Sequence, residues 1–279
     1  MTVADVRSCA VADVRSCANE ILLLARARVI LVAGASCSGK TVLSRALVTA
    51  FAEAGTSALH VTLDDYYVGI ARNPRDENGD FDFETPDALD ASRVSADLDS
   101  LAAGRPTRLH RYDFATHEAG EDAVPTQIAP HGRIVLEGIH AFNPKMSALI
   151  PESAKCRVLV NPRPPVAGVD SDTLRLVRRL VRDERLRAIA PAETIRMWPQ
   201  VLAGERRWLQ PFRAAADIEY DSAFPGEFPD LARAAFPLVL AVCRARPDDE
   251  AAAALLRTLG ACLPDEMALH DKRRKDNES

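Results

Sequence analysis

Residues 34–41 read Gly-Ala-Ser-Cys-Ser-Gly-Lys-Thr, and this octapeptide decides the fold. It follows an apolar run, Val-Ile-Leu-Val-Ala at 29–33, and precedes a helical pattern over 42–48. A strand, a glycine-rich loop ending in Lys-Thr and a helix are together typical of a phosphate-binding loop. The alternative is an ordinary strand-to-helix turn, which the flanking strand and helix disfavour.

In such a loop the backbone N–H groups surround a β-phosphate at a helix N-terminus, where the helix dipole favours anions. The lysine adds a positive charge between the β- and γ-phosphates, and the threonine offers a hydroxyl to Mg²⁺. We therefore expect nucleotide contacts from Gly34, Ala35, Ser36, Cys37, Ser38, Gly39, Lys40 and Thr41. Within this set Cys37 has no functional account of its own.

Composition excludes several classes of protein. The chain has 279 residues, of which 47% are hydrophobic and 27% charged, as in ordinary globular proteins. A net charge of −5 disfavours a broad nucleic-acid surface. The six cysteines form no C-x-x-C pair, and no apolar run is long enough for a membrane span. With no secretory signal pattern at the N-terminus, we expect a cytoplasmic protein with neither nucleic-acid nor membrane partners.

The first residues contain a duplication, because residues 3–10 and 11–18 both read V-A-D-V-R-S-C-A. Two copies of eight residues are too short for a repeat architecture. We predict a helical N-terminal extension over 1–24 without chemistry. A paired-cysteine sensor at Cys9 and Cys17 is the alternative.

Strand and helix patterns alternate from residue 28 onward. The expected strands are 28–33, 58–63, 133–136, 157–160 and 218–220, and the expected helices are 39–54, 88–103, 172–188, 192–216, 231–246 and 250–262. This order predicts an α/β fold with a parallel sheet sandwiched by helices. Ligands bind such sheets at the carboxyl ends of the strands, where the loop 34–41, Asp64-Asp65 and Glu137 all fall.

The carboxylates at this edge match the needs of phosphoryl transfer to an alcohol, which requires a phosphate cradle, a metal and a group that deprotonates the hydroxyl. We expect Asp64 to be the general base, with Asp65 as the second candidate, and Lys40 to assist catalysis. Glu137 is expected beside Mg²⁺, acting through a water, with Thr41 as the other metal-binding residue. The alternatives are that Asp64-Asp65 only caps a loop and that Glu137 is a solvated strand-end acid.

Four arginines share one helix face, since Arg175, Arg178, Arg179 and Arg182 are spaced i, i+3, i+4 and i+7. Like charges so placed repel, so an anion should lie nearby. Asp172, Asp183 and Glu184 could offset part of the charge, and a triphosphate could offset more. We favour a lid over the transferring phosphoryl group, with a solvated basic face as the alternative.

Six motifs in order resemble the uridine kinase and phosphoribulokinase-like family of P-loop kinases, in particular its nucleoside kinase branch. They are the loop 34–41, D-D-Y-Y at 64–67, F-D-F-E-T-P-D-A-L-D at 81–90, Y-D-F-A-T-H at 112–117, E-G-I-H-A-F at 137–142 and R-L-V-R-R-L-V-R-D at 175–183. The resemblance covers about 28–222.

The resemblance implies a P-loop NTPase-type five-stranded parallel sheet with an Arg-rich helical lid, in a single kinase domain over 25–265 followed by a charged tail over 266–279. It implies ATP (or GTP) with Mg²⁺ as donor and a nucleoside as acceptor. The substrate residues implied are Tyr67, Phe83, Glu84, Tyr112, His117 and Arg175, with Glu84 on the ribose and Tyr112 and His117 on the base. Arg178 and Arg182 would serve the lid and the nucleotide.

Departures from the family pattern concern the acceptor. Glu84 stands where the nucleoside kinases usually have Asp, Ala119 replaces an Arg, and Ala188-Ile189 replaces Gly-Arg. Without the resemblance, an ordinary core or surface position is the more frequent interpretation of Tyr112 and His117 than a base-binding role.

The leading hypothesis is therefore an ATP-dependent uridine or cytidine kinase. A kinase of a sugar phosphate or pantothenate-like alcohol, and a nucleotide-binding regulatory module without turnover, remain the alternatives. The sequence does not fix the oligomeric state and is compatible with a homo-oligomer.

Overall fold

The computed structural model describes residues 7–9, 14–23, 27–77, 79–114, 116–164 and 166–263. The chain divides into two compact units, one comprising Met1–Asn161 and Val201–Ser222 and the other Pro162–Gln200 and Ala223–Ser279. Our expectation of a single domain over 25–265 spans both units and stays a prediction. The expected tail over 266–279 lies outside the described residues.

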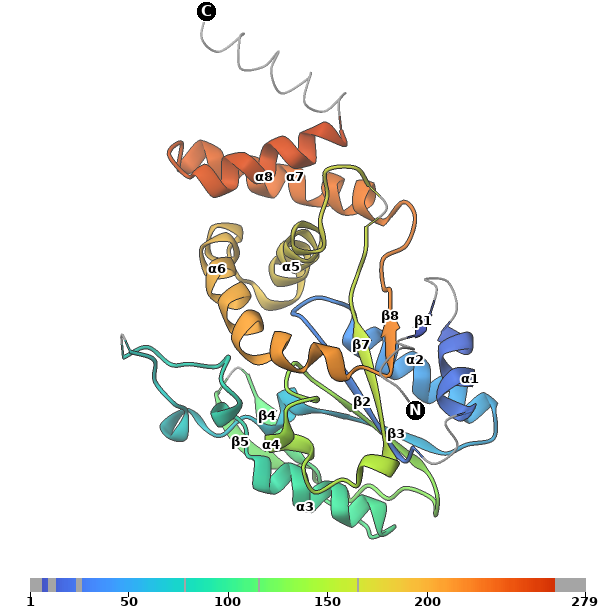
Figure 1. Cartoon of the computed structure of the whole chain (residues 1–279). Helices are drawn as coiled ribbons and strands as arrows, with labels where there is room; N and C mark the ends of the chain where they lie inside the picture. The colour runs from blue at the N-terminus through green and yellow to red at the C-terminus, as the bar shows by residue number, and fades with distance from the viewer. Residues whose placement is uncertain are drawn as a thin grey trace, which may run out of the picture. The chain divides into compact units, whose positions relative to one another are not determined.

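The first unit is built on a parallel sheet (Figure 1). Its strands are β1 (Arg7–Cys9), β2 (Val29–Gly34), β3 (Ala58–Thr62), β6 (Arg133–Glu137), β7 (Lys155–Val160) and β8 (Ile218–Tyr220), in the order β1-β8-β7-β2-β6-β3. Every pairing in this sheet is parallel. The five expected strands are confirmed, and β1 adds a sixth.

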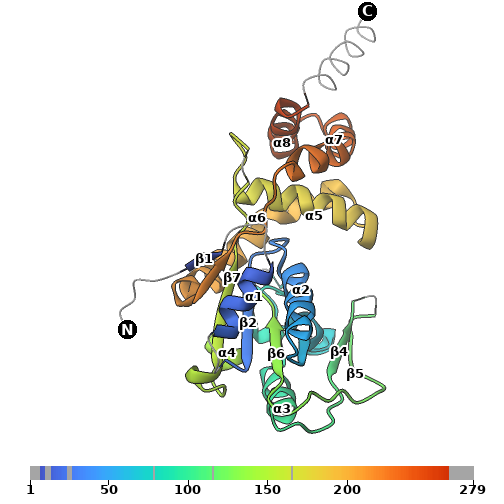
Figure 2. The same cartoon turned by 90° about the vertical axis from the view of Figure 1, so that its right-hand side faces the viewer.

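Helices cover both faces of this sheet (Figure 2). On one face α1 (Val14–Leu23) and α2 (Lys40–Glu53) pack against Ile30 and Val32. On the other, α3 (Ala91–Ala102) and the short α4 (Pro144–Ser147) pack in the core that contains Leu31. Alternate residues of β2 thus enter opposite cores, which explains why its sequence is continuously apolar.

The duplicated octapeptide adopts two different structures. In the first copy Arg7–Cys9 forms β1 beside β8, whereas in the second copy the same Arg-Ser-Cys lies in α1. The expectation of a wholly helical extension was therefore wrong for β1, because pairing with β8 overrides the local propensity. Cys17 is buried.

An antiparallel hairpin of β4 (His110–Asp113) and β5 (Glu118–Glu121) was not predicted.

The second unit holds α5 (Ser171–Arg187), α7 (Glu227–Ala245) and α8 (Glu250–Ala261) around a common apolar core. The helix α6 (Pro191–Trp208) contributes Ile195 to that core, and its last eight residues belong to the first unit. The helix predicted over 192–216 ends early at Trp208, and a 3₁₀ segment Gln210–Ala215 follows.

Candidate functional site

The loop 34–41 joins β2 to α2 in a conformation that few sequences allow. Cys37 and Gly39 have φ of 57° and 95°, so the chain turns twice through the left-handed region. A Cβ on Gly34 would lie 2.6 Å from both Ser38 Oγ and the carbonyl of Val160. The loop therefore requires glycine at this position, and its turns form the kind of backbone concavity that receives anions.

Several contacts fix the loop from within the first unit. Lys40 Nζ donates to the carbonyl of Ala35 at 2.9 Å, and Ser222 Oγ donates to the carbonyl of Ser38 at 2.5 Å. The backbone N–H of Ser36 donates to Glu205 Oε1 at 2.8 Å. The lysine thus folds over the loop, as expected of a group that meets a phosphate there.

Glu137 lies at the carboxyl end of β6 and contacts side chains from α2 and β3. Thr41 Oγ1 donates to Glu137 Oε1 at 3.0 Å, and His60 Nε2 lies 3.1 Å from Glu137 Oε2. Burial raises the pKa of Glu137, but the hydrogen bond from His60 and the charge of Lys40 lower it more, so the net pKa lies below its ordinary value. Glu137 is therefore an ionised carboxylate that is 3% exposed, and not a solvated strand-end acid.

These residues fit a magnesium ion. Mg²⁺ prefers oxygen ligands and usually takes one or two from protein carboxylates or hydroxyls, the rest coming from phosphates and water. An ionised Glu137 in contact with the Thr41 hydroxyl supplies that set. Within the described residues, no group of three or more His, Cys, Asp or Glu side chains is arranged to hold a metal ion. Phosphate oxygens and water would therefore have to complete the coordination.

Asp64 lies at the same edge as the loop and Glu137. In the register of the sheet, Glu137 pairs with both Val32 of β2 and Thr62 of β3. A 3₁₀ turn, Leu63–Tyr66, follows β3 at once, and Thr62 caps it by accepting from the N–H of Asp64 at 3.3 Å. Asp64 is exposed.

Asp65 is held differently, which separates the two candidates for the base. Its carboxylate forms an ion pair with Arg111, which also binds Asp122. Its carbonyl lies 2.6 Å from His110 Nδ1. Burial raises the pKa of Asp65, although Arg111 opposes the rise. Asp65 thus has a structural role in this turn, and the role of Asp64 as the general base stays a prediction.

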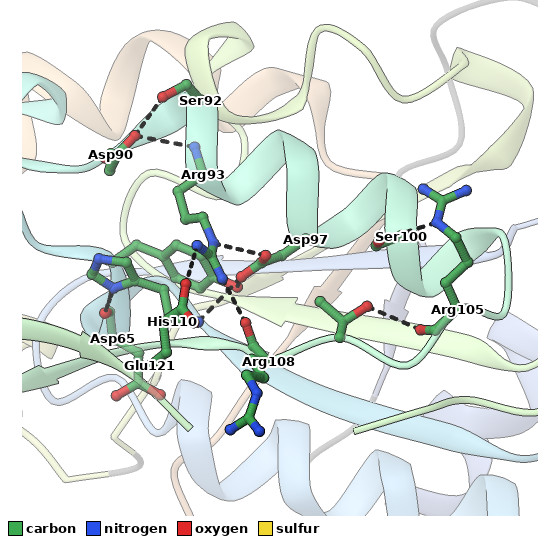
Figure 3. A network of polar contacts seen from close by, with 12 residues as sticks. Asp65, Asp90, Ser92, Arg93, Asp97, Ser100, Arg105, Arg108, His110 and Glu121 are labelled. Carbon is green, nitrogen blue, oxygen red and sulfur yellow. Dashed lines mark hydrogen bonds and ion pairs between the residues drawn. The ribbon is translucent and has the colours of Figure 1, made fainter. Parts of the chain in front are cut away.

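A buried network anchors this turn (Figure 3). Asp97 on α3 accepts from Tyr66 Oη at 2.9 Å, from the N–H of His110 at 3.1 Å and from Arg93 Nε at 2.8 Å. The rings of Tyr66 and His110 stack with centroids 5.3 Å apart. The network thus holds the carbonyl of Asp65 and the side chain of Tyr66, directly after Asp64 in the chain.

Four of the predicted substrate residues, Tyr67, Phe83, Tyr112 and His117, come together in one cluster of rings that also contains Phe81 and Phe114. Tyr67 lies 5.4 Å from Tyr112 and 6.0 Å from Phe83, and Phe83 stacks with His117 at 6.2 Å. The phenol oxygen of Tyr112 lies 3.1 Å from His117 Nδ1. Tyr112 is buried, whereas His117 and Phe114 are exposed, so the cluster reaches the surface.

Glu84 lies against the end of α6. A Cβ on Gly204 would lie 2.8 Å from Glu84 Cβ and 3.2 Å from Oε2, so the helix backbone touches the carboxylate side chain. His140 is 2% exposed, and among the described residues neither of its ring nitrogens has a hydrogen-bond partner. Burial lowers the pKa of His140 to about 4; the nearby backbone of Glu84 opposes this shift, and the charges of Lys145 and Lys40 add to it.

The arginine face of α5 belongs to the second unit, where three carboxylates offset much of the charge of its four arginines. Arg178 forms two hydrogen bonds with Glu227, at 2.7 and 2.8 Å. The other pairs join Arg175 to Asp172 and both Arg179 and Arg182 to Asp183. Arg175 is 3% exposed and lies over the ring of Trp198. Arg179 and Arg182 share a single carboxylate, so these pairs offset the charge of the face only in part. The lid and substrate roles of Arg175, Arg178 and Arg182 stay predictions.

Sequence reasoning missed His60, His140, Gly204 and Glu205. Each contacts a predicted site residue or its surroundings, but none belongs to a motif position with an assigned role. For His60 the signal was its place two residues before the end of a strand that leads to the site.

The sequence is similar to that of known proteins over most of its length. Residues 29–219 match the model of the family described as Phosphoribulokinase / Uridine kinase family. A uridine kinase of Chloroflexus aurantiacus is 32% identical over 202 residues, covering 70% of this chain and 85% of the relative. A uridine kinase of Bacillus licheniformis is 30% identical over 192 residues, covering 68% and 83%.

Solved structures share the fold. A putative fructose transport system kinase from Silicibacter sp. TM1040 gives a TM-score of 0.54 at 18% identity, covering 74% of this chain and 98% of that one. D-glycerate 3-kinase from Cryptococcus neoformans gives 0.50 at 15% identity, covering 72% and 89%. Among the described residues, no helix is both long and apolar enough to cross a membrane.

Proposed function

The chain belongs to the phosphoribulokinase / uridine kinase family, and from this premise we propose that it transfers the γ-phosphoryl group of ATP to the 5′-hydroxyl of a pyrimidine nucleoside, uridine or cytidine. The relatives named uridine kinase, at about 30% identity, support this choice of acceptor.

The observation that carries the proposal is the ring cluster that contains Tyr67, Phe83, Tyr112 and His117. A partly exposed set of rings suits a planar base, which gains from stacking and edge contacts. A sugar phosphate or a pantothenate-like alcohol has no aromatic ring and would gain little from it. The carboxylate of Glu84 can accept two hydrogen bonds from a vicinal diol such as that of ribose.

The chain's own residues have distinct tasks in this reaction. The loop amides and Lys40 bind the donor phosphates, and Asp64 accepts the proton of the 5′-hydroxyl. As the acceptor oxygen bonds to the γ-phosphorus, the bond from that phosphorus to the bridging oxygen breaks and ADP leaves with the electron pair. Thr41 and Glu137 would hold Mg²⁺, which neutralises charge on the phosphate oxygens when bound.

A coupled ADP-release assay tests the acceptor, with ATP or GTP as donor and uridine, cytidine, D-fructose, D-glycerate and pantothenate as candidates. We expect turnover with the pyrimidine nucleosides alone. Turnover only with a sugar, a sugar acid or pantothenate would move the chain to another acceptor class. Tight ATP binding without turnover on any compound would favour a regulatory module.

A further inference from the structure

The last two turns of α6 carry contacts that the proposed chemistry has not used. Glu205 is 5% exposed and accepts a hydrogen bond from the N–H of Ser36, inside the phosphate-binding loop, at 2.8 Å. An acidic side chain is unexpected here, because the loop amides bind anions and the carboxylate of Glu205 would repel the phosphates of a nucleotide. We therefore expect Glu205 to have a role that outweighs this repulsion.

Gly204, the preceding residue, packs against Glu84, the residue that we expect to bind the acceptor. A Cβ there would lie 2.8, 3.0 and 3.2 Å from Cβ, Cγ and Oε2 of Glu84. At such distances any side chain on Gly204 would force the carboxylate of Glu84 to move. The glycine therefore allows the side chain of Glu84 to pack directly against the backbone of α6.

Trp208, one helical turn after Gly204, extends the same contact surface. Its ring lies 6.4 Å from the ring of His140 in an edge-to-face arrangement, and His140 lies beside the backbone of Glu84. Residues four apart share a helix face, so Gly204 and Trp208 together hold the surroundings of Glu84.

Two consecutive residues of one helix thus hold the donor loop and the acceptor carboxylate. A helix is stiff over two residues, so a ligand that shifts one contact also shifts the other. We propose that Glu205 is a positioning residue for the phosphate-binding loop, and that the Gly204-Glu205 pair couples nucleotide binding to acceptor binding. The identity of the acceptor rests on the proposed function, but the effect of Glu205 on the loop does not.

The loop half is tested by titrating ADP, without acceptor, into wild type, Glu205→Ala, Glu205→Gln and the exposed neighbour Arg206→Gln in a calorimeter. Alanine removes one hydrogen bond to the loop, which should weaken ADP binding about five- to tenfold. Glutamine keeps an acceptor oxygen and removes the negative charge, so it should bind ADP as tightly as wild type or more tightly. Arg206→Gln should match wild type.

An alanine variant that binds ADP like wild type would overturn the role of Glu205. So would a glutamine variant as weak as the alanine variant, because that result would trace the effect to the charge and not to the hydrogen bond. A merely structural role would lower the melting temperature of both variants and leave the ADP affinity of the folded protein unchanged. If the alanine variant does not fold, Glu205→Met takes its place, because it keeps the length of the side chain and removes the acceptor oxygen; it should weaken ADP binding as alanine does, and wild-type affinity would overturn the role of Glu205.

The coupling half is tested by measuring the ADP dissociation constant with and without saturating uridine. We expect uridine to tighten ADP binding at least about fivefold in wild type, and less than twofold in Glu205→Ala. Gly204→Ala should weaken uridine about tenfold while ADP alone binds normally, and its helix gains propensity. Uridine that binds wild type without affecting ADP would overturn the coupling. If uridine does not bind, cytidine replaces it in the same titration. If neither nucleoside binds, the proposed function fails, while the ADP titrations without acceptor still decide the role of Glu205.

Discussion

Replacing His140 with leucine should remove a large part of the acid sensitivity of the fold. His140 is 2% exposed, and burial lowers its pKa from 6.5 to about 4. Between these values the unfolded chain binds a proton at this residue and the folded chain does not. The free energy of unfolding therefore falls as the pH is lowered from 6.5 to about 4, and no further loss arises from this group below that.

The size of the effect follows from the pKa difference, which is worth about 3 kcal/mol over the whole interval. Leucine has a similar volume and no titratable group, so the variant should lose about 3 kcal/mol less stability than wild type between pH 7 and pH 4. At pH 7 the variant should be at least as stable, because the two unpartnered ring nitrogens of His140 leave the interior.

Urea unfolding at pH 7, 5.5 and 4 measures this difference directly. The exposed His131 provides a matched control, and asparagine suits its φ of 63°. His131→Asn should keep the pH dependence of wild type. A leucine variant with the same pH dependence as wild type would refute the assignment of His140 as a buried neutral imidazole.

Three further predictions concern the loop, the base and the arginine face. Gly34→Ala should weaken ADP binding about 100-fold or more without unfolding the protein, since its Cβ would lie 2.6 Å from Ser38 Oγ; calorimetry and melting curves decide, and normal affinity would contradict the loop geometry. Asp64→Asn should lower kcat by about 10²–10⁴-fold with an unchanged ADP dissociation constant; a normal kcat would exclude Asp64 as the base. Arg178→Gln should cost about 1–3 kcal/mol of unfolding free energy by leaving Glu227 without its two-point partner. A double-mutant cycle with Glu227→Gln that shows no coupling would contradict that pair.

Local sequence patterns predicted the strands of the parallel sheet and the helix that follows the phosphate-binding loop. The apolar run before Gly34 and the Lys-Thr that opens α2 defined the strand, the loop and the helix, which the structure contains as β2 and α2. The carboxyl-edge argument placed Glu137 close to Thr41, and the hydrogen bond between them bears this out. These inferences needed only the residues within one strand and the turn that follows it.

What the sequence did not reveal depends on distant pairings. The contact of His60 with Glu137 requires the register of β3 against β6, and that of Glu205 with Ser36 joins residues 169 positions apart. The partner of Arg178 lies on another helix, so the charge pattern of α5 alone overstated the need for an external anion. The two copies of Arg-Ser-Cys, one in a strand and one in a helix, show tertiary context prevailing over an identical local sequence.

The most direct test of the account is to incubate the protein with ATP, Mg²⁺ and either uridine or 5′-deoxyuridine, and to identify the products by ³¹P NMR. Cytidine is incubated in the same way. We expect a nucleoside 5′-monophosphate and ADP in equal amounts from uridine or cytidine, and neither product from 5′-deoxyuridine, which lacks the accepting hydroxyl. ADP formed equally with all three nucleosides, or no nucleoside monophosphate from uridine or cytidine, would contradict the central claim.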